Sequence, residues 1–135
     1  MPVNSGQYCF PPHLRLLTSS DFKTVFDNTD IKVFDKNFII LGMLSTLPYP
    51  RLGIVVAKKK IRKANDRNRL KRTVRESFRL NQSILSGVDL IVIPSKNSNL
   101  IDKSILTKSL SRAWKKAEKS HYKLLSSRPE NLTVK

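Results

Sequence analysis

The sequence predicts a single α+β domain in which helices pack on one face of one mixed sheet. The chain has 135 residues, which fits one domain, and 39% of them are hydrophobic, enough to form a core. Segments with helical spacing and β-branched runs follow one another in the order α-β-β-α-β-α, with room for a further short strand near 30–34. The stretch 51–93 has the order strand, helix, strand. It therefore predicts two parallel strands and, by the general rule, a right-handed crossover.

The domain is expected to span residues 13–125. Residues 1–12 contain Pro2, Gly6, Pro11 and Pro12, and this composition predicts an irregular lead-in. Residues 126–135 show no helical or strand periodicity and are expected to form a flexible tail.

The first predicted helix covers roughly residues 19–28. Thr18 and Asp21 have the spacing of a capping box, in which each side chain accepts a hydrogen bond from the backbone N–H of the other residue. Phe22, Val25 and Phe26 follow at helical spacing. Aromatic residues in such a pattern usually belong to a core, so burial is the simplest interpretation of both phenylalanines.

Strands are expected where β-branched and aromatic residues are concentrated, at 33–34, 37–44, 51–57 and 88–93. The stretch 51–57 is almost continuously apolar, which predicts burial on both faces of the sheet. Pro94 should end the last strand.

Two further helices complete the predicted order. The second helix should begin at Asn65 or Asp66, which are both good N-cap residues, and should run to Leu80 or Asn81. The last helix should run from 102 to about 125. Its predicted apolar face consists of Ile105, Leu106, Leu110, Ala113, Trp114 and Ala117.

Residues 58–79 concentrate the charge of the chain. They contain eleven Lys or Arg against Asp66 and Glu76, which gives a net charge of +9 out of +16 for the whole chain. Leu70, Val74 and Phe78 form an apolar seam through this segment, within an arc of about 80° on a helix. A fixed cationic array on a small protein predicts a polyanionic partner, most simply a nucleic acid.

Most of the basic side chains between 66 and 80 fall in one fan of about 160° beside that seam. Glu76 lies inside the fan and can pair with Arg72 or Arg79. Positive charges recur every four residues at 67, 71, 75 and 79, which costs roughly a few tenths of a kcal/mol per pair without a neutralising partner. A merely solvated face would mix both signs, so the fan predicts a binding surface.

Arg67 does not fit this simple picture, because a regular helix aims it at the edge of the apolar seam. Either the helix begins there, or the side chain lies across the edge of the sheet with its stem buried and its head in solvent.

Catalytic and metal-binding classes find little support in the sequence. Cys9 is the single cysteine, and His13 and His121 are the two histidines, so an intrachain disulfide is excluded and neither a zinc site nor a Cys/His pair is indicated. The apolar runs 38–41 and 90–93 are too short to span a bilayer. The first residues lack the basic and apolar regions of a signal peptide, and the expected compartment is the cytoplasm.

Four blocks of the chain resemble the family of bacterial ribonuclease P protein subunits. Residues 67–79 (RNRLKRTVRESFR) are similar to its RNR motif, 14–26 to its N-terminal block, 51–59 to the strand before the basic helix, and 89–94 to the strand after it. The resemblance implies the fold of the second domain of ribosomal protein S5, with a left-handed crossover between the parallel strands.

The resemblance also implies a subunit of a ribonucleoprotein enzyme, in which a catalytic RNA removes the 5′ leader from precursor tRNA by Mg²⁺-dependent hydrolysis. The RNA would hold most of the Mg²⁺, and the protein alone would be a non-catalytic monomer without membrane contacts. Its partners would be RNase P RNA and precursor tRNA. The residues facing the catalytic RNA would be Arg67, Asn68, Arg69, Lys71, Arg72, Arg75 and Arg79. A cleft for the single-stranded leader would be lined by Phe22, Phe26, Arg51, Lys58 and Lys59.

Other classes stay open at this point. A structural RNA-binding protein, either ribosomal or an assembly factor, would share the charge but would not need Phe22 and Phe26 to be accessible. A DNA-binding helix would enter the major groove, although the fan is wider than a groove-reading face needs. A stand-alone nuclease has the least support, because no carboxylate cluster suited to two metal ions is visible.

Overall fold

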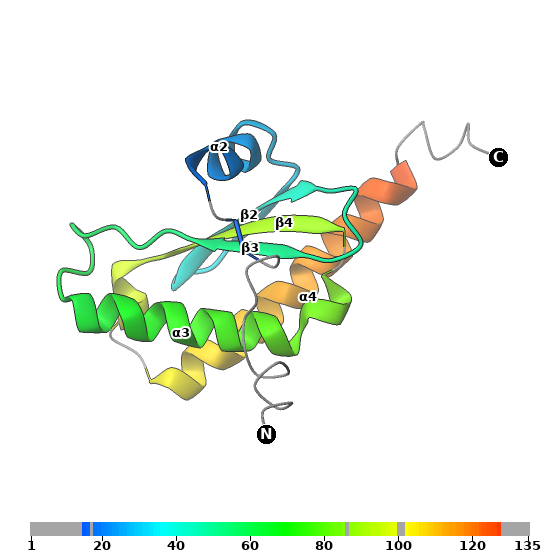
Figure 1. The fold of residues 1–135 in the computed structure, drawn as a ribbon. Helices are drawn as coiled ribbons and strands as arrows, with labels where there is room; N and C mark the ends of the chain where they lie inside the picture. Colours follow the sequence, from blue (N-terminus) through cyan, green and yellow to red (C-terminus); the bar gives the residue numbers. More distant parts are fainter. Residues whose placement is uncertain (1–14, 17, 86, 100–101, 128–135) are drawn as a thin grey trace, which may run out of the picture.

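The computed structural model describes residues 15–16, 18–85, 87–99 and 102–127. The predicted lead-in lies outside these residues, as does the predicted tail except for 126–127, which continue the last helix. The element order is the predicted one, with the further short strand included (Figure 1). The elements are α2 (Ser19–Asp27), β1 (Ile31–Phe34), β2 (Phe38–Leu44), β3 (Arg51–Ile54), α3 (Ala64–Leu80), η2 (Gln82–Ile84), β4 (Val88–Pro94), η3 (Lys96–Asn99) and α4 (Lys103–Ser127).

The sheet has four strands in the order β1-β2-β4-β3. β2 is antiparallel to both β1 and β4, whereas β3 and β4 are parallel, as predicted. The connection from β3 through α3 to β4 is left-handed (Figure 1), so the family resemblance predicted the hand correctly and the general rule did not. Outside β3, the N–H of Leu16 donates to the carbonyl of Leu52 at 3.0 Å, which covers that edge of the sheet.

Helices cover both faces of the sheet, which corrects the prediction that they pack on one face only. α3 and α4 lie on one side of the sheet, and α2 lies on the other (Figure 1). The alternation of side chains along β4 explains this arrangement: Leu90 and Val92 join the core under α3 and α4, whereas Ile91 joins the smaller cluster under α2 with Val25. A strand that is apolar on both faces needs cover on both.

The strand β3 ends three residues earlier than predicted, at Ile54. One further bond follows, from the N–H of Val55 to the carbonyl of Val92 at 3.0 Å. The next rung of the parallel ladder would need an N–H from residue 94, which is a proline and has none. The chain therefore leaves the sheet after Val55 and turns at Ala57, whose carbonyl accepts from Lys60 and Ile61.

The start of α2 follows the predicted capping box. The N–H of Asp21 donates to Oγ1 of Thr18 at 3.1 Å, and the N–H of Thr18 donates to Oδ2 of Asp21 at 3.2 Å. The two bonds satisfy backbone donors that the first turn of a helix leaves free.

The start of α3 differs from the prediction of Asn65 or Asp66 as N-cap. The helix begins at Ala64, and Lys63 occupies the N-cap position without a capping bond from its side chain. Asp66 lies in the first turn, where its negative charge interacts favourably with the positive end of the helix dipole. Its carboxylate also accepts a hydrogen bond from Asn99.

Candidate nucleic-acid interface

The basic helix α3 is anchored by its apolar side. Leu70, Val74 and Phe78, the predicted seam, are all buried. The ring of Phe78 meets Trp114 of α4 edge to face, with centroids 5.9 Å apart and planes at 73°. Nε1 of Trp114 donates to Oγ of Ser77 at 2.7 Å, and both groups are buried. α3 is therefore fixed to α4 by packing and by a specific hydrogen bond.

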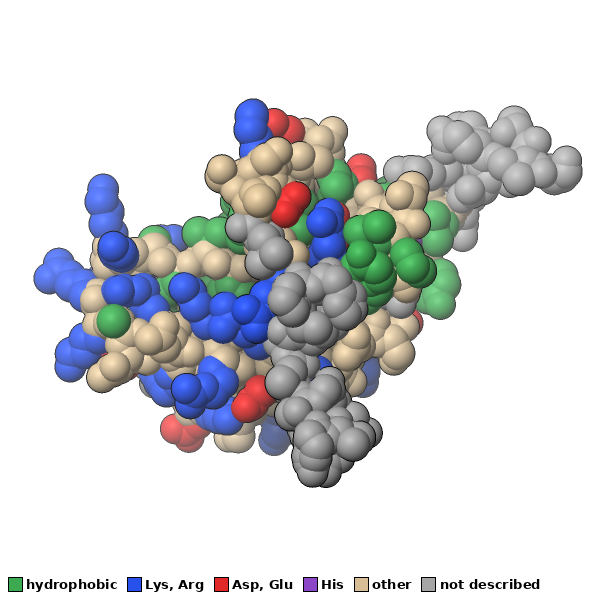
Figure 2. All heavy atoms as spheres, in the orientation of Figure 1, with side chains coloured by type: hydrophobic (Ala, Val, Ile, Leu, Met, Phe, Trp, Pro, Cys, Tyr) green, Lys and Arg blue, Asp and Glu red, His purple; other side chains and the backbone are tan. Residues whose placement is uncertain are grey.

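The opposite side of α3 carries five of the predicted cations together with Asn68. Asn68, Arg69 and Arg72 are exposed, and Lys71, Arg75 and Arg79 are half-buried. We call these six residues the α3 basic face. Figure 2 shows Lys and Arg side chains spread over α3 and the loop that precedes it. Glu76 lies against Lys103 of α4, with 3.4 Å between Oε2 and Nζ, whereas its spacing in the sequence favoured Arg72 or Arg79.

Arg67 lies at the N-terminal end of α3 and folds back onto the preceding loop. Its Nη1 donates to the carbonyl of Ile61 at 3.0 Å and to that of Arg62 at 2.7 Å. Neither of the two arrangements expected from the sequence describes it, because the helix begins before Arg67 and the guanidinium binds backbone rather than crossing the sheet edge. Arg67 therefore shapes the loop that carries Lys58 and Lys59.

Arg69 belongs to a polar link that sequence reasoning missed. Its Nη2 donates to Oδ1 of Asn99, and Nδ2 of Asn99 donates to Oδ2 of Asp66 at 3.2 Å. Asn99 lies at the end of η3, so this link joins the first turns of α3 to the segment that follows β4. A separation of 30 residues between Arg69 and Asn99 gives no local signal in the sequence.

Arg75 lies in a positive environment. Burial, and then the nearby guanidinium of Arg15, lower the pKa of Arg75. Two cations held close together in this way favour an anion that contacts both.

Phe22 and Phe26, two of the five residues predicted to line a leader cleft, line one depression beside α2. It has a volume of about 450 Å³ and is lined by Ser19, Phe22, Lys23, Phe26 and Val55. We call it the α2 depression. The two phenylalanines differ, since Phe22 is half-buried against the cluster under α2 whereas Phe26 is 44% exposed. Burial, the simplest expectation from spacing, therefore holds in part for Phe22 and not for Phe26.

Lys58, Lys59 and Arg51 do not line the α2 depression, and Arg51 is engaged in an ion pair. Its Nε donates to Oδ1 of Asp89 at 3.0 Å, and its Nη2 donates to Oδ2 at 2.7 Å. The Asp89 side chain is 1% exposed and that of Arg51 is 25% exposed. The hydrogen bond with Asp89 raises the pKa of Arg51, although burial opposes it. Arg51 is thus already neutralised in large part, whereas Lys58 and Lys59 are exposed in the turn after Val55.

The described residues contain no cluster of three or more His, Cys, Asp or Glu side chains arranged to hold a metal ion. Within the same residues, no helix combines the length and the apolar character that crossing a membrane requires.

Comparisons with known proteins show the family of the chain. The family model described as Ribonuclease P matches residues 10–118. The chain belongs to the ribonuclease P protein family. The ribonuclease P protein component of Chromohalobacter salexigens is 44% identical over 110 residues, covering 82% of this chain and 86% of that protein. That of Saccharophagus degradans is 42% identical and covers 91% of each chain.

Solved structures of ribonuclease P proteins share the fold. The protein from Thermotoga maritima is 34% identical with a TM-score of 0.64, covering 73% of this chain and 96% of that chain. The Staphylococcus aureus protein is 27% identical with a TM-score of 0.70, covering 76% and 93%. Membership of the ribonuclease P family makes the chain a subunit of the ribonuclease P holoenzyme, with an RNA partner, and decides against the ribosomal, DNA-binding and stand-alone nuclease alternatives.

Proposed function

We propose that the protein binds two RNAs through two separate surfaces during removal of the 5′ leader from precursor tRNA. The α3 basic face, with Arg67 at its N-terminal end, binds the catalytic RNA. The α2 depression, with Lys58 and Lys59 beside it, binds the single-stranded leader. The observation that carries this proposal is a cationic helix face held rigidly to the core through Ser77, Phe78 and Trp114.

Several features support the first surface. The Arg and Lys side chains lie on one helix, so their spacing is set before the RNA arrives and little ordering is needed on binding. Arginine offers a planar fork that grips phosphates in two places. Arg67 can serve both roles, because both of its bonds to the loop use Nη1, while Nε and Nη2 take no part in them.

The α2 depression suits an unpaired strand. Phe26 offers an accessible aromatic face, on which a base can stack with a gain of about 1–3 kcal/mol. Lys58 and Lys59 supply point charges for the neighbouring phosphates. Arg51 contributes less charge here than its position suggests, because Asp89 already neutralises it.

Hydrolysis in this proposal depends on Mg²⁺ bound mainly by the RNA subunit. The protein contributes by binding and positioning RNA, acts in the cytoplasm, and is a monomer before assembly.

Reconstitution with the RNase P RNA at low Mg²⁺ tests the proposal. We expect little precursor-tRNA cleavage by the RNA alone, none by the protein alone, and efficient cleavage by the two together. Affinity should rise with leader length until the α2 depression is filled. Equal binding of precursor and mature tRNA in the presence of the RNA subunit would contradict the leader site.

A further inference from the structure

The helix α4 carries a second basic face. Apart from Lys103 in its first turn, the basic residues of α4 fall within an arc of about 100° around the helix axis, at 100° per residue. All of them are exposed. We call this set the α4 basic face: Lys108, Arg112, Lys115, Lys116, Lys119 and Lys123.

The charges of the α4 basic face are not balanced within the described part of the chain. The salt bridges formed there involve Lys23, Arg51 and Lys103, and none includes these six residues. Glu118 is the single acidic residue between 103 and 127 and lies outside the arc. Like charges four residues apart destabilise a helix unless an anion neutralises them. Positive charges also recur every four residues along the basic face of α3.

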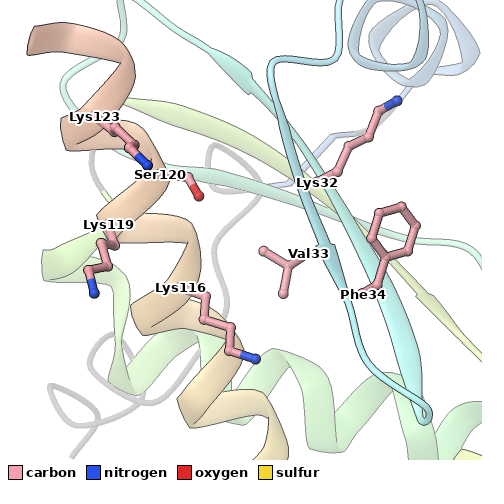
Figure 3. A pocket seen from close by; sticks show the side chains of 7 residues that line it. All are labelled: Lys32, Val33, Phe34, Lys116, Lys119, Ser120 and Lys123. Carbon is pink, nitrogen blue, oxygen red and sulfur yellow. The ribbon is translucent and has the colours of Figure 1, made fainter. Parts of the chain in front are cut away.

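A groove separates this face from the edge strand β1. It has a volume of about 570 Å³, and Figure 3 shows the side chains around it. α4 contributes Lys116, Lys119, Ser120 and Lys123, and β1 contributes Lys32, Val33 and Phe34. Val33 is buried and points toward α4, whereas Lys32 and Phe34 point away from α4 at the rim of the groove, and Phe34 is 67% exposed (Figure 3). We call this site the β1–α4 groove.

The groove continues into a neighbouring hollow of about 490 Å³ lined in part by Lys32, Lys123 and Leu124. Asp30 also lines this hollow, but its Oδ2 accepts a hydrogen bond from the N–H of Leu44 at 3.2 Å. The lysines therefore dominate the charge along the groove.

The backbone of β1 also faces the groove edge. The N–H of Asp35 donates to the carbonyl of Phe38. Hydrogen-bonded pairs recur at every second residue of an antiparallel ladder, so Val33 and Ile40 form the next such pair. The N–H and C=O groups of Lys32 and Phe34 consequently point away from β2. No described strand pairs with that edge.

The β1–α4 groove is separate from the two surfaces of the proposed function. β1 and β3 lie at opposite edges of the sheet, three strand spacings or roughly 14 Å apart. α3 contacts β3, whereas α4 contacts β1. An RNA bound to the α3 basic face would have to extend around the molecule to reach the groove.

We propose that the β1–α4 groove binds a single-stranded segment of RNA. The α4 lysines contact phosphates, and the strand crosses the edge of β1 so that an unpaired base stacks on Phe34, which points away from α4. Lys116 to Lys123 span roughly 10 Å of helix axis, so they meet a repeating charge rather than a single one. Lysines act as point charges, so the contact carries no base sequence information. This inference rests on RNA as the partner and adds a third contact surface to the proposed function.

The test uses a triple variant, Lys116→Ala/Lys119→Ala/Lys123→Ala, and the charge-conserving triple Lys→Arg variant at the same positions. Binding is measured against salt for two arms: the RNase P RNA alone, and precursor tRNA with a long or a short leader added to the assembled holoenzyme. The plot of log K against log salt has a negative slope. The alanine variant should make that slope shallower by about two units in one arm, at roughly 0.7 per lost phosphate contact. The arginine variant should keep the slope.

The arm that responds identifies the RNA that occupies the groove. Phe34→Ala should weaken binding in the same arm by roughly 5- to 150-fold at an unchanged slope. Unchanged slopes in both arms would overturn the proposal. So would a poly-glutamate peptide that binds the wild-type protein, does not bind the alanine variant and is not displaced by RNA. Arg72→Ala provides a separate control: if it leaves assembly with the RNase P RNA intact, the proposed function of the α3 basic face fails independently of the groove.

Discussion

The ring of Phe22 lies directly against the backbone of Gly53. A Cβ placed on residue 53 would be 2.5 Å from Cε1 and 2.6 Å from Cζ of that ring. Gly53 therefore lets α2 approach the sheet closely enough for Phe22 to pack and for the α2 depression to form.

We expect Gly53→Ala to destabilise the fold by about 1–3 kcal/mol, because the ring must move away from the added methyl group. Leader-dependent affinity should fall, because Phe22 lines the depression. Urea unfolding followed by the fluorescence of Trp114, the single tryptophan of the chain, measures the first effect. In a Phe22→Ala background the same Gly53→Ala change should cost much less. An equal cost in both backgrounds would show that the ring is not what opposes the methyl group.

Arg72 and Arg67 should respond differently to removal, although both belong to the basic helix. Arg72 is exposed, so Arg72→Ala should leave stability almost unchanged and reduce the salt slope of binding to the RNase P RNA by about one unit. Arg67→Ala should also lower the free energy of unfolding by about 1.5–3 kcal/mol, because Ile61 and Arg62 lose a charged donor to their carbonyls.

Thermal unfolding and salt titration of the two variants separate these effects. Arg67→Lys serves as a control that keeps the charge but replaces the planar guanidinium with a single ammonium group. We expect it to recover the salt slope more fully than the stability. Identical stability losses for Arg72→Ala and Arg67→Ala would argue against the clamping role of Arg67.

The Arg51–Asp89 pair leads to an asymmetric prediction. Removing one partner of a buried pair costs about 3–5 kcal/mol, because the other charge is left uncompensated. Asp89→Ala leaves Arg51, which still reaches solvent, whereas Arg51→Ala leaves a carboxylate that is 1% exposed. We therefore expect Arg51→Ala to be the more destabilising of the two in chemical unfolding, and the reverse order would contradict the assigned burial.

The pH dependence of this pair follows from the sign of the shift at Arg51. The hydrogen bond with Asp89 raises the pKa of Arg51 in the folded state. The stabilisation by this pair is therefore fully present below the pKa that Arg51 has in the unfolded chain. It is lost only as the pH rises through the pKa of the folded state. Both values lie far above neutrality. The stability difference between wild type and Asp89→Asn should thus stay constant between about pH 6 and pH 9.

Local patterns in the sequence predicted what depends on neighbours along the chain. The Thr18–Asp21 capping box and the seam of Leu70, Val74 and Phe78 are confirmed, because three- and four-residue spacings fix them. The partners of Arg51 and Arg69 lie 38 and 30 residues away, where chain order gives no signal. The early end of β3 depends likewise on Pro94 in the neighbouring strand, so it could be explained only once the register was known.

The hydrogen bond between Trp114 and Ser77 should affect RNA binding through the position of α3 and not through the charge of that helix. Ser77→Ala leaves the buried Nε1 of Trp114 without an acceptor, which should cost about 1–3 kcal/mol of stability. Affinity for the RNase P RNA should fall modestly at an unchanged salt slope, because every cation of the α3 basic face is retained. Trp114→Phe removes the donor, so in that background Ser77→Ala should cost little stability. Circular dichroism can follow the unfolding of these variants. If the salt slope fell in Ser77→Ala, the hydroxyl would be acting on the phosphate contacts themselves and not through the packing of α3 on α4.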